Sequence, residues 1–390
     1  MILFIERSPI GISDYYCMTQ KVHGGNIYQF AKNHNIAPQD VIDFSANINP
    51  LGANKKGVDM MKSQIDMITH YPDPNHKELL DVAAQYYKID PSMIVAGNGA
   101  AEILSAICRL PNYTGVMVPA PGFSEYESSA SMAHMEVAPI YYKCNEDEKI
   151  FEVPYTALKS FAAKLHGQDG RVILFLGNPN NPDGTLLDID QVDELARIYD
   201  YIDSLLVIDE SFIDFTDGSH SVRQLVRKHD NLIVVHSLTK FFAVPGLRIG
   251  LAFANTSLTR QIQSLIPTWS VNSLAQVYAI EALQDISYSQ AAKEYIQQEK
   301  ERMYDAYNAL PGVVAYKPSV NFMLIHWQHK KVTVEDLKTF LEDHQILIRS
   351  CDNFYGLGND WFRIAIKSVE LNNRLLMTIK EFMNEYNLFG

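Results

Sequence analysis

The sequence has few cysteines, a deficit of basic side chains and no long hydrophobic run. Cys17, Cys108, Cys144 and Cys351 form no C-x-x-C pair, which argues against a zinc site or a disulfide framework and fits a reducing cytoplasm. The 33 basic and 46 acidic residues give a formal net charge of −13, so no broad basic surface for nucleic acid or anionic lipid is expected. No apolar stretch reaches the ~18 residues of a membrane span, and a soluble protein is predicted.

The chain also lacks low-complexity tracts and repeats of fixed period. Its apolar run 1–5 is followed at once by Glu6 and Arg7, which makes it too short for a secretory signal. A composition of 47% hydrophobic and 20% charged residues is that of an ordinary globular protein. At ~150 residues per domain, the length suits one large and one small domain.

Short apolar runs alternate with helical patterns in the middle of the chain. We expect buried strands at residues 171–177, 204–209, 232–237 and 249–254. One crossover helix is expected over 188–200, with Asp188 or Asp190 as its cap. Nearly continuous apolar strands separated by helices predict an α/β fold, in which helices cover both faces of a mostly parallel sheet.

A second region follows Asn272. Helices are expected at 273–283, 288–310, 334–344 and 369–386, and strands at 321–327, 346–349 and 362–366. The Gly-, Asn- and Pro-rich stretches within 1–60 favour an arm or loops over a core. The expected division is an N-terminal arm and small-domain part at 1–60, a large domain at 61–285 and a small C-terminal domain at 286–390.

Four polar residues lie at the expected ends of the central strands: Asn181, Asp209, Lys240 and Arg248. Ligands of open α/β sheets bind at this edge. Taken singly, each has an ordinary explanation, such as a tight turn around Asn181, a helix cap at Asp209 or a solvated lysine at 240. Their common position favours a site, and no metal ligand set is expected.

Asp209 follows Asn181 by 28 residues and precedes Lys240 by 31, and Arg248 follows eight residues after the lysine. This order resembles the fold-type I pyridoxal phosphate enzymes. The resemblance implies pyridoxal 5'-phosphate as the cofactor, Lys240 as its covalent attachment point and Asp209 as the partner of the pyridine nitrogen. It further implies that Asn181 bonds the phenolic oxygen. The residues implied around the phosphate are Ser237, Thr239 and Arg248.

The same resemblance assigns cofactor contacts earlier in the chain. Ala100 and Ala101 follow Gly-Asn-Gly at the start of an expected helix, where backbone N–H groups can bind a phosphate. Phe123 matches the aromatic residue that stacks on the pyridine ring. Tyr71 matches the tyrosine that reaches the cofactor phosphate of a neighbouring subunit, so a homodimer with shared active sites is implied.

Two arginines, Arg349 and Arg363, lie within expected strands of the C-terminal region. An arginine in an apolar β pattern is costly unless it meets an anion or faces water from an edge strand. In the family, this pair faces the cofactor and binds substrate anions. Two cations suit a substrate that carries both a carboxylate and a phosphate.

Three motifs resemble the L-threonine-O-3-phosphate decarboxylases of cobalamin biosynthesis more than the related histidinol-phosphate aminotransferases. They are His-Gly-Gly-Asn at 23–26 with Asp-Phe-Ser-Ala-Asn-Ile-Asn-Pro at 43–50, Pro-Gly-Phe-Ser-Glu-Tyr-Glu at 121–127, and Asp-Glu-Ser-Phe at 209–212. Aminotransferases usually carry tyrosine where Phe212 stands. The resemblance implies that His23, Gly24, Gly25 and Asn47 bind substrate.

The predicted function is therefore decarboxylation of a phosphorylated β-hydroxy amino acid to an amino-alcohol phosphate. Threonine phosphate and serine phosphate differ by one methyl group, and the sequence does not choose between them beyond the family's usual preference for threonine phosphate. The alternatives are a histidinol-phosphate-type aminotransferase and a non-catalytic module that only binds the cofactor.

Overall fold

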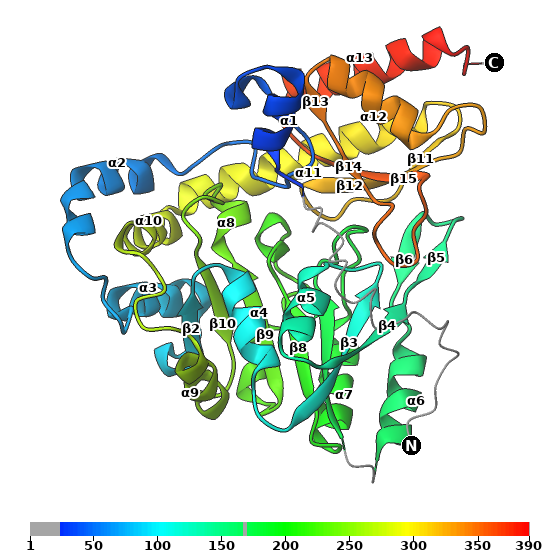
Figure 1. The fold of residues 1–390 in the computed structure, drawn as a ribbon. Helices are drawn as coiled ribbons and strands as arrows, with labels where there is room; N and C mark the ends of the chain where they lie inside the picture. The colour runs from blue at the N-terminus through cyan, green and yellow to red at the C-terminus, as the bar shows by residue number, and fades with distance from the viewer. Residues whose placement is uncertain (1–23, 167–169, 390) are drawn as a thin grey trace.

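A seven-stranded sheet forms the centre of the computed structural model, which describes residues 24–166 and 170–389 (Figure 1). The strand order is β2-β10-β9-β8-β7-β3-β4. The strands are β2 Ile94–Gly97, β3 Tyr113–Ala120, β4 Glu136–Tyr141, β7 Arg171–Gly177, β8 Leu205–Asp209, β9 Leu232–Ser237 and β10 Gly250–Phe253. All neighbouring pairs are parallel except the two that β10 makes.

Both faces of this sheet are buried, as the apolar strand pattern predicts. Leu206 and Ile208 of β8 belong to one hydrophobic core, whereas Val207 between them belongs to another. Side chains alternate between the two faces of a strand, so each face has its own core. The first core includes side chains of α7 (Ile189–Asp200), and the second includes side chains of α4 (Ala100–Cys108) and α9 (Thr256–Leu265).

β10 is the antiparallel strand in a sheet that is otherwise parallel, which agrees with the mostly parallel sheet predicted from the sequence. The chain between β9 and β10 contains only the four-residue helix α8 (Leu238–Phe241), instead of a full crossover helix. The chain therefore turns back at the same edge of the sheet, and Gly250 pairs with Ser237. This reversal brings Arg248 to the edge at which the parallel strands end.

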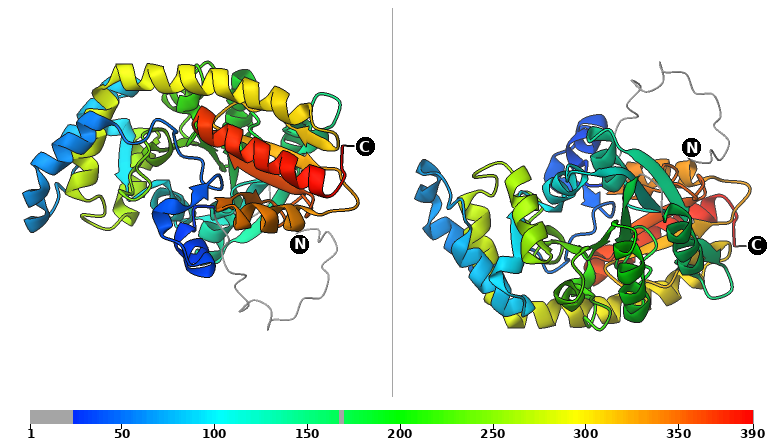
Figure 2. Two further views of the ribbon diagram at one scale, coloured as in Figure 1. Left: turned by 90° about the horizontal axis from the view of Figure 1, so that it is seen from above. Right: turned by 90° about the horizontal axis from the view of Figure 1, so that it is seen from below.

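A second, four-stranded antiparallel sheet lies in the C-terminal part, in the order β11-β12-β15-β14. Its strands are β11 Val313–Ala315, β12 Phe322–Trp327, β14 Arg349–Ser350 and β15 Trp361–Ala365. The helices of this part are α11 Ile286–Asn308, α12 Val334–Asp343 and α13 Val369–Glu385, of which α11 extends along one side of the molecule with α13 beside it (Figure 2).

The expected strand 346–349 is split in the structure. β13 (Ile346–Leu347) pairs in parallel with β1 (Ile42–Asp43), whereas β14 pairs with β15. β1 and β13 thus form a separate two-stranded sheet that ties the N-terminal region to the C-terminal part, and α1 (Ile27–His34) lies beside α12 (Figure 2). The loop after β1 differs from a solvated arm because Phe44 is fully buried.

The remaining helices and strands lie outside the sheets described above. They are α2 Lys55–Ser63, α3 Lys77–Tyr87, α5 Glu125–Met132, β5 Lys143–Asn145, β6 Ile150–Glu152, α6 Tyr155–Leu165, α10 Ser273–Gln284 and the 3-10 helices Pro38–Asp40, Ile65–Thr69, Pro91–Met93, Ile213–Phe215 and Arg223–Arg227. Of the two predicted alternatives, Asp188 is the residue that caps α7, by accepting from the backbone of Gln191. Over 24–166 and 170–389, every helix is too short or too polar to cross a membrane.

Candidate active site

The predicted polar residues come together at one edge of the central sheet. β7, β8 and β9 end at Gly177, Asp209 and Ser237, and Gly177 pairs directly with Asp209. Lys240 lies in α8, three residues beyond the end of β9. The edge formed by the carboxyl ends of parallel strands is the usual place for a ligand. The structure brings Asp209 and Arg248 near Lys240 at this edge, and Asn181 contacts Arg363, whose charge also acts on Lys240.

The electrostatics of Lys240 reflect this shared position. Burial, together with the positive charges of Arg248 and Arg363, lowers its pKa from 10.5 to about 8, although the negative charge of Asp209 acts in the opposite direction. A desolvated amine near other cations loses its proton more readily, because the charged form is disfavoured. Lys240 therefore has a substantial neutral, nucleophilic fraction at mildly alkaline pH.

Asp209 is 6% exposed and is held by two donors. The Tyr126 hydroxyl donates to its Oδ2 at 2.9 Å, and the Ser211 backbone N–H donates to its Oδ1 at 2.9 Å. The Tyr126 ring stacks on Phe175 at 5.2 Å and contacts the edge of Phe123 at 5.6 Å. Burial raises the pKa of Tyr126 well above 10, so its hydroxyl stays a donor.

Tyr126 is not among the site residues predicted from the sequence. The signal for it lies in the motif already noted, because Tyr126 stands three residues after Phe123. Residues at i and i+3 of a helical turn are neighbours on its surface. A side chain that meets the expected ring-stacking residue and the expected ring-nitrogen partner belongs to the same site.

The N-terminus of α4 forms a cradle at the place where the cofactor phosphate is predicted to bind. A Cβ atom on Gly250 would lie 2.5 Å from the backbone nitrogen of Ala100, and one on Gly99 would overlap the Arg248 guanidinium. The backbone of Ala100 thus lies against Gly250, and the Arg248 guanidinium lies against Gly99, at positions where a larger residue would not fit. The Ser237 and Thr239 hydroxyls, 2.7 Å apart, complete the predicted set with Ala101. Helix N-termini of this kind bind anions.

Asn181 lies in a turn that several hydrogen bonds hold in place, and its side chain contacts Arg363. Asn180 donates to the backbone oxygen of Pro121 at 2.9 Å, and the Ser319 hydroxyl donates to that of Gly184 at 2.6 Å. Arg363 donates to Asn181 Oδ1 through Nη1 and to the backbone oxygen of Ser45 through Nη2 at 2.7 Å. Asn181, which is expected to bind the phenolic oxygen, is therefore in contact with Arg363, which is expected to bind a substrate anion.

Arg349 and Arg363 lie directly opposite each other on β14 and β15. They are 6% and 5% exposed, which rules out the alternative of arginines that face water. Arg349 donates to Asn353 Oδ1 at 2.7 Å and lies over the Phe354 ring at 5.0 Å. Burial lowers the pKa of Arg363 to about 10, and its Nε has no partner among the described residues.

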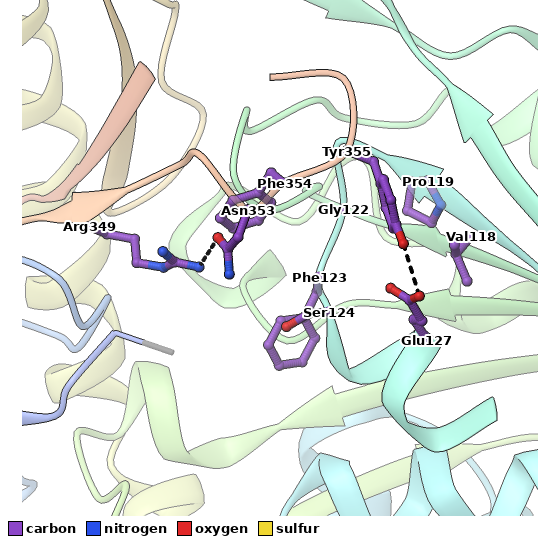
Figure 3. A pocket seen from close by; sticks show the side chains of 10 residues that line it. All are labelled: Val118, Pro119, Gly122, Phe123, Ser124, Glu127, Arg349, Asn353, Phe354 and Tyr355. Atoms are coloured by element: carbon purple, nitrogen blue, oxygen red, sulfur yellow. Dashed lines mark hydrogen bonds between the residues drawn. The ribbon is translucent and has the colours of Figure 1, made fainter. Parts of the chain in front are cut away.

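A small cleft of about 30 Å³ lies between Arg349 and Phe123 (Figure 3). On one side of this cleft, the Tyr355 hydroxyl donates to Glu127 Oε1 at 3.0 Å, the hydrogen bond that is dashed in Figure 3. The other lining residues are Val118, Pro119, Gly122, Ser124, Asn353 and Phe354. Phe123, which is expected to stack on the cofactor ring, and Arg349, which is expected to bind an anion, therefore line the same cleft.

The structure describes some, but not all, of the substrate-binding residues that are predicted near the N-terminus. Gly25 donates its backbone N–H to the Ser45 hydroxyl at 2.7 Å, and Gly24 packs against Ser45. Asn47 is 4% exposed, and its Oδ1 has no partner within the described part of the chain. His23 lies outside the described residues. Tyr71 is 79% exposed and stacks on Trp269 at 4.5 Å, away from the buried cluster.

These residues fit pyridoxal 5'-phosphate. A lysine with a lowered pKa suits an aldehyde, a carboxylate suits a pyridinium, and the α4 cradle suits a phosphate. The unpartnered atoms Asn47 Oδ1 and Arg363 Nε indicate that a ligand completes the site. Residues 24–166 and 170–389 contain no cluster of His, Cys, Asp and Glu that could hold a metal ion.

Comparison with known proteins places this site in a family. Residues 39–379 match the sequence profile of "Aminotransferase class I and II". The chain is 31% identical over 363 residues to the threonine-phosphate decarboxylase of Salmonella typhimurium, covering 93% of this chain and 96% of that protein. It is 33% identical over 355 residues to the adenosylcobalamin biosynthesis bifunctional protein CobDQ of Leptospira interrogans, covering 91% of this chain but only 40% of CobDQ.

Solved structures give the same result. The L-threonine-O-3-phosphate decarboxylase of Porphyromonas gingivalis matches with a TM-score of 0.75 and 26% identity, covering 88% of this chain and 100% of that one. The histidinol-phosphate aminotransferase of Clostridium acetobutylicum matches with a TM-score of 0.81 and 29% identity, with the same coverage. The chain belongs to the class I and II aminotransferase family of pyridoxal phosphate-dependent enzymes.

Proposed function

We propose that the protein is a decarboxylase of L-threonine O-3-phosphate, with L-serine O-phosphate as the closest alternative substrate. The observation that carries this proposal is the buried pair Arg349 and Arg363, which lie opposite each other on adjacent strands. Two desolvated guanidinium groups side by side need anionic partners. A substrate with a carboxylate and a phosphate supplies one for each.

The cofactor-binding residues are proposed from their places in the site. Lys240 attaches the cofactor, Asp209 meets the pyridine nitrogen, Asn181 meets the phenolic oxygen and Phe123 packs on the ring. The phosphate is held by Ala100, Ala101, Ser237, Thr239 and Arg248. When bound, the cofactor supplies an electron sink for the pair released at the substrate Cα.

The protein side chains then decide which bond at Cα breaks. Arg363 is fixed between Asn181 and Ser45. A carboxylate bound to it has a fixed orientation, and only a bond aligned with the conjugated ring is weakened. Arg349 and Asn47 hold the phosphate end, with Gly24 and Gly25 nearby. The Cα–carboxylate bond breaks, carbon dioxide leaves, and Cα takes up a proton, for which the Lys240 amine is the proposed donor.

A histidinol-phosphate aminotransferase is the second candidate, because such an enzyme matches with a TM-score of 0.81. Phe212 argues against it. Its ring packs against Phe322 at 5.0 Å, and Phe322 lies beneath the Arg363 guanidinium at 5.5 Å. Aminotransferases of this group usually have a hydroxyl at that position, which here is replaced by an apolar contact beneath an anion ligand.

We also propose a homodimer that shares its active sites. Exposed apolar side chains gather near Tyr71 and Trp269, which stack on each other. Large exposed apolar patches mark interaction surfaces. The further members are Ile65, Met67 and Ile68, which are 48%, 37% and 67% exposed. In the dimer, Tyr71 reaches the cofactor phosphate of the second subunit.

Product identification tests the proposed activity. The pyridoxal phosphate-loaded protein is given threonine phosphate and serine phosphate in competition, without 2-oxoglutarate. Carbon dioxide and an equal amount of aminopropanol phosphate are expected, with threonine phosphate consumed first. Accumulation of pyridoxamine phosphate, together with turnover of histidinol phosphate that requires 2-oxoglutarate, would assign the protein to the aminotransferases instead.

A further inference from the structure

Ser45 lies where three segments of the chain meet. It is 2% exposed, and its hydroxyl donates to Asp43 Oδ1 at 2.5 Å while accepting the Gly25 backbone N–H at 2.7 Å. Its backbone oxygen accepts from Arg363 at 2.7 Å. One buried serine thus connects the Gly24–Gly25 segment to an arginine that the proposed function gives to the substrate.

The Gly24–Gly25 backbone is shaped for this contact. A Cβ atom on Gly24 would overlap the carbonyl oxygen of Ser45, so only glycine permits the approach. Gly25 has a φ of 86°, which side-chain-bearing residues rarely adopt. Two successive residues are therefore suited to lie against Ser45 rather than to cross the surface as an unconstrained arm.

Asp43 fixes the orientation of Ser45. Its Oδ1 accepts from the Ser45 backbone N–H at 2.8 Å, from the Ser45 hydroxyl and from the Ala46 N–H at 3.3 Å. Asp43 is itself held in β1, where it pairs with Leu347. Because the hydroxyl donates its hydrogen bond to the carboxylate, a lone pair of the Ser45 oxygen is free to accept from the Gly25 N–H.

We propose that Ser45, oriented by Asp43, is a positioning residue that docks the Gly24–Gly25 segment beside Arg363 and thereby sets the affinity for the phosphorylated substrate. The inference rests on the proposed function. Without the hydroxyl, the Gly25 N–H loses its acceptor, and the segment leaves the site more often. Such a loss weakens binding of the substrate and of the transition state equally, so KM rises while kcat stays constant.

The test compares Ser45→Ala with Ser204→Ala in the cofactor-loaded protein. Ser204 is a matched control because it is 1% exposed and also accepts a backbone N–H, from Val172 at 3.1 Å, just before β8 begins at the opposite edge of the sheet. Steady-state kinetics with threonine phosphate are measured beside hydrogen exchange of residues 24–31. Asp43→Asn serves as a milder variant that keeps the shape of the side chain.

Ser45→Ala is expected to raise KM about tenfold with kcat within about twofold, as one lost hydrogen bond implies. Exchange over 24–31 should be faster in Ser45→Ala and, less so, in Asp43→Asn, and unchanged in Ser204→Ala. Unchanged exchange in Ser45→Ala, or equal changes in the Ser204 variant, would overturn the inference. If the unmodified protein releases no carbon dioxide, the proposed activity fails, and the exchange comparison alone decides the docking role.

Discussion

The orientation of the Asp209 carboxylate depends on a neighbouring side chain, Tyr126. The Tyr126 hydroxyl that donates to it comes from the motif that also supplies Phe123. Hydrogen bonds to charged groups contribute about 1.5–3 kcal/mol each. The carboxylate that is proposed to meet the cofactor ring is thus oriented by a residue that need not touch the cofactor.

Tyr126→Phe is expected to lower kcat/KM by about tenfold to a hundredfold, because Asp209 loses its donor. The control is Tyr142→Phe, since Tyr142 is also buried but its hydroxyl has no partner among the described residues. Steady-state kinetics of both variants check this. Equal losses in the two variants would show that the Tyr126 hydroxyl has no specific effect.

The lowered pKa of Lys240 predicts how the rate of aldehyde attachment depends on pH. With a pKa of about 8, half of the amine is neutral at pH 8, against about 0.3% for an ordinary lysine. The rate of attachment of pyridoxal, which lacks the phosphate, should therefore rise with pH to a midpoint near 8. Arg248→Gln removes a positive charge that disfavours the ammonium form, so the midpoint should move upward. A midpoint near 10 in the unmodified protein would refute the assigned environment.

At the scale of elements, the approach of α4 to β10 builds the phosphate cradle. Gly250 permits this approach, because any side chain there would meet the backbone of Ala100. The positions of the two elements are set by the sheet, in which Gly250 pairs with both Gly97 and Ser237. The cradle is therefore a property of packing between elements and not of one loop.

Gly250→Ala should lower the free energy of unfolding by about 1–3 kcal/mol and weaken pyridoxal phosphate binding, because the α4 N-terminus must shift. Gly115→Ala is the control, since a Cβ atom there makes only contacts of 3.4 Å or more. Thermal unfolding and cofactor titration measure both effects. Binding that stays unchanged in Gly250→Ala would contradict the placement of the phosphate at α4.

Most elements follow from local patterns in the sequence, and the exceptions depend on distant contacts. The apolar runs at 171–177 and 232–237 are strands with those bounds, because burial on both faces leaves a continuous signal. The break of 346–349 into two strands could not be foreseen, since it results from pairing with β1, some 300 residues away. The same holds for the Ser45–Arg363 contact, which no local spacing encodes.

At the scale of the whole molecule, the exposed apolar surface around Tyr71 and Trp269 is the proposed contact with a second copy of the chain. Ile68, 67% exposed, lies in the 3-10 helix just before Tyr71. The proposed second copy of the chain would cover this surface and receive Tyr71 at its cofactor phosphate. Cofactor affinity should therefore depend on association.

Ile68→Asp should shift the protein from dimer to monomer and weaken pyridoxal phosphate binding, because a charge is buried at the interface. Tyr201→Asp is the control, since Tyr201 is 75% exposed and lies just after α7, away from this patch. Sedimentation and cofactor titration report the two effects. A monomeric unmodified protein that binds the cofactor tightly would exclude shared sites.

The central claim is that Lys240 captures the aldehyde of the cofactor at the edge of the sheet. Reduction of the pyridoxal phosphate-loaded protein with borohydride, followed by peptide mass spectrometry, tests it most directly. We expect one pyridoxyl group per chain, on the peptide that contains Lys240, and none in Lys240→Ala. A label on another lysine, or no label at all, would contradict the account.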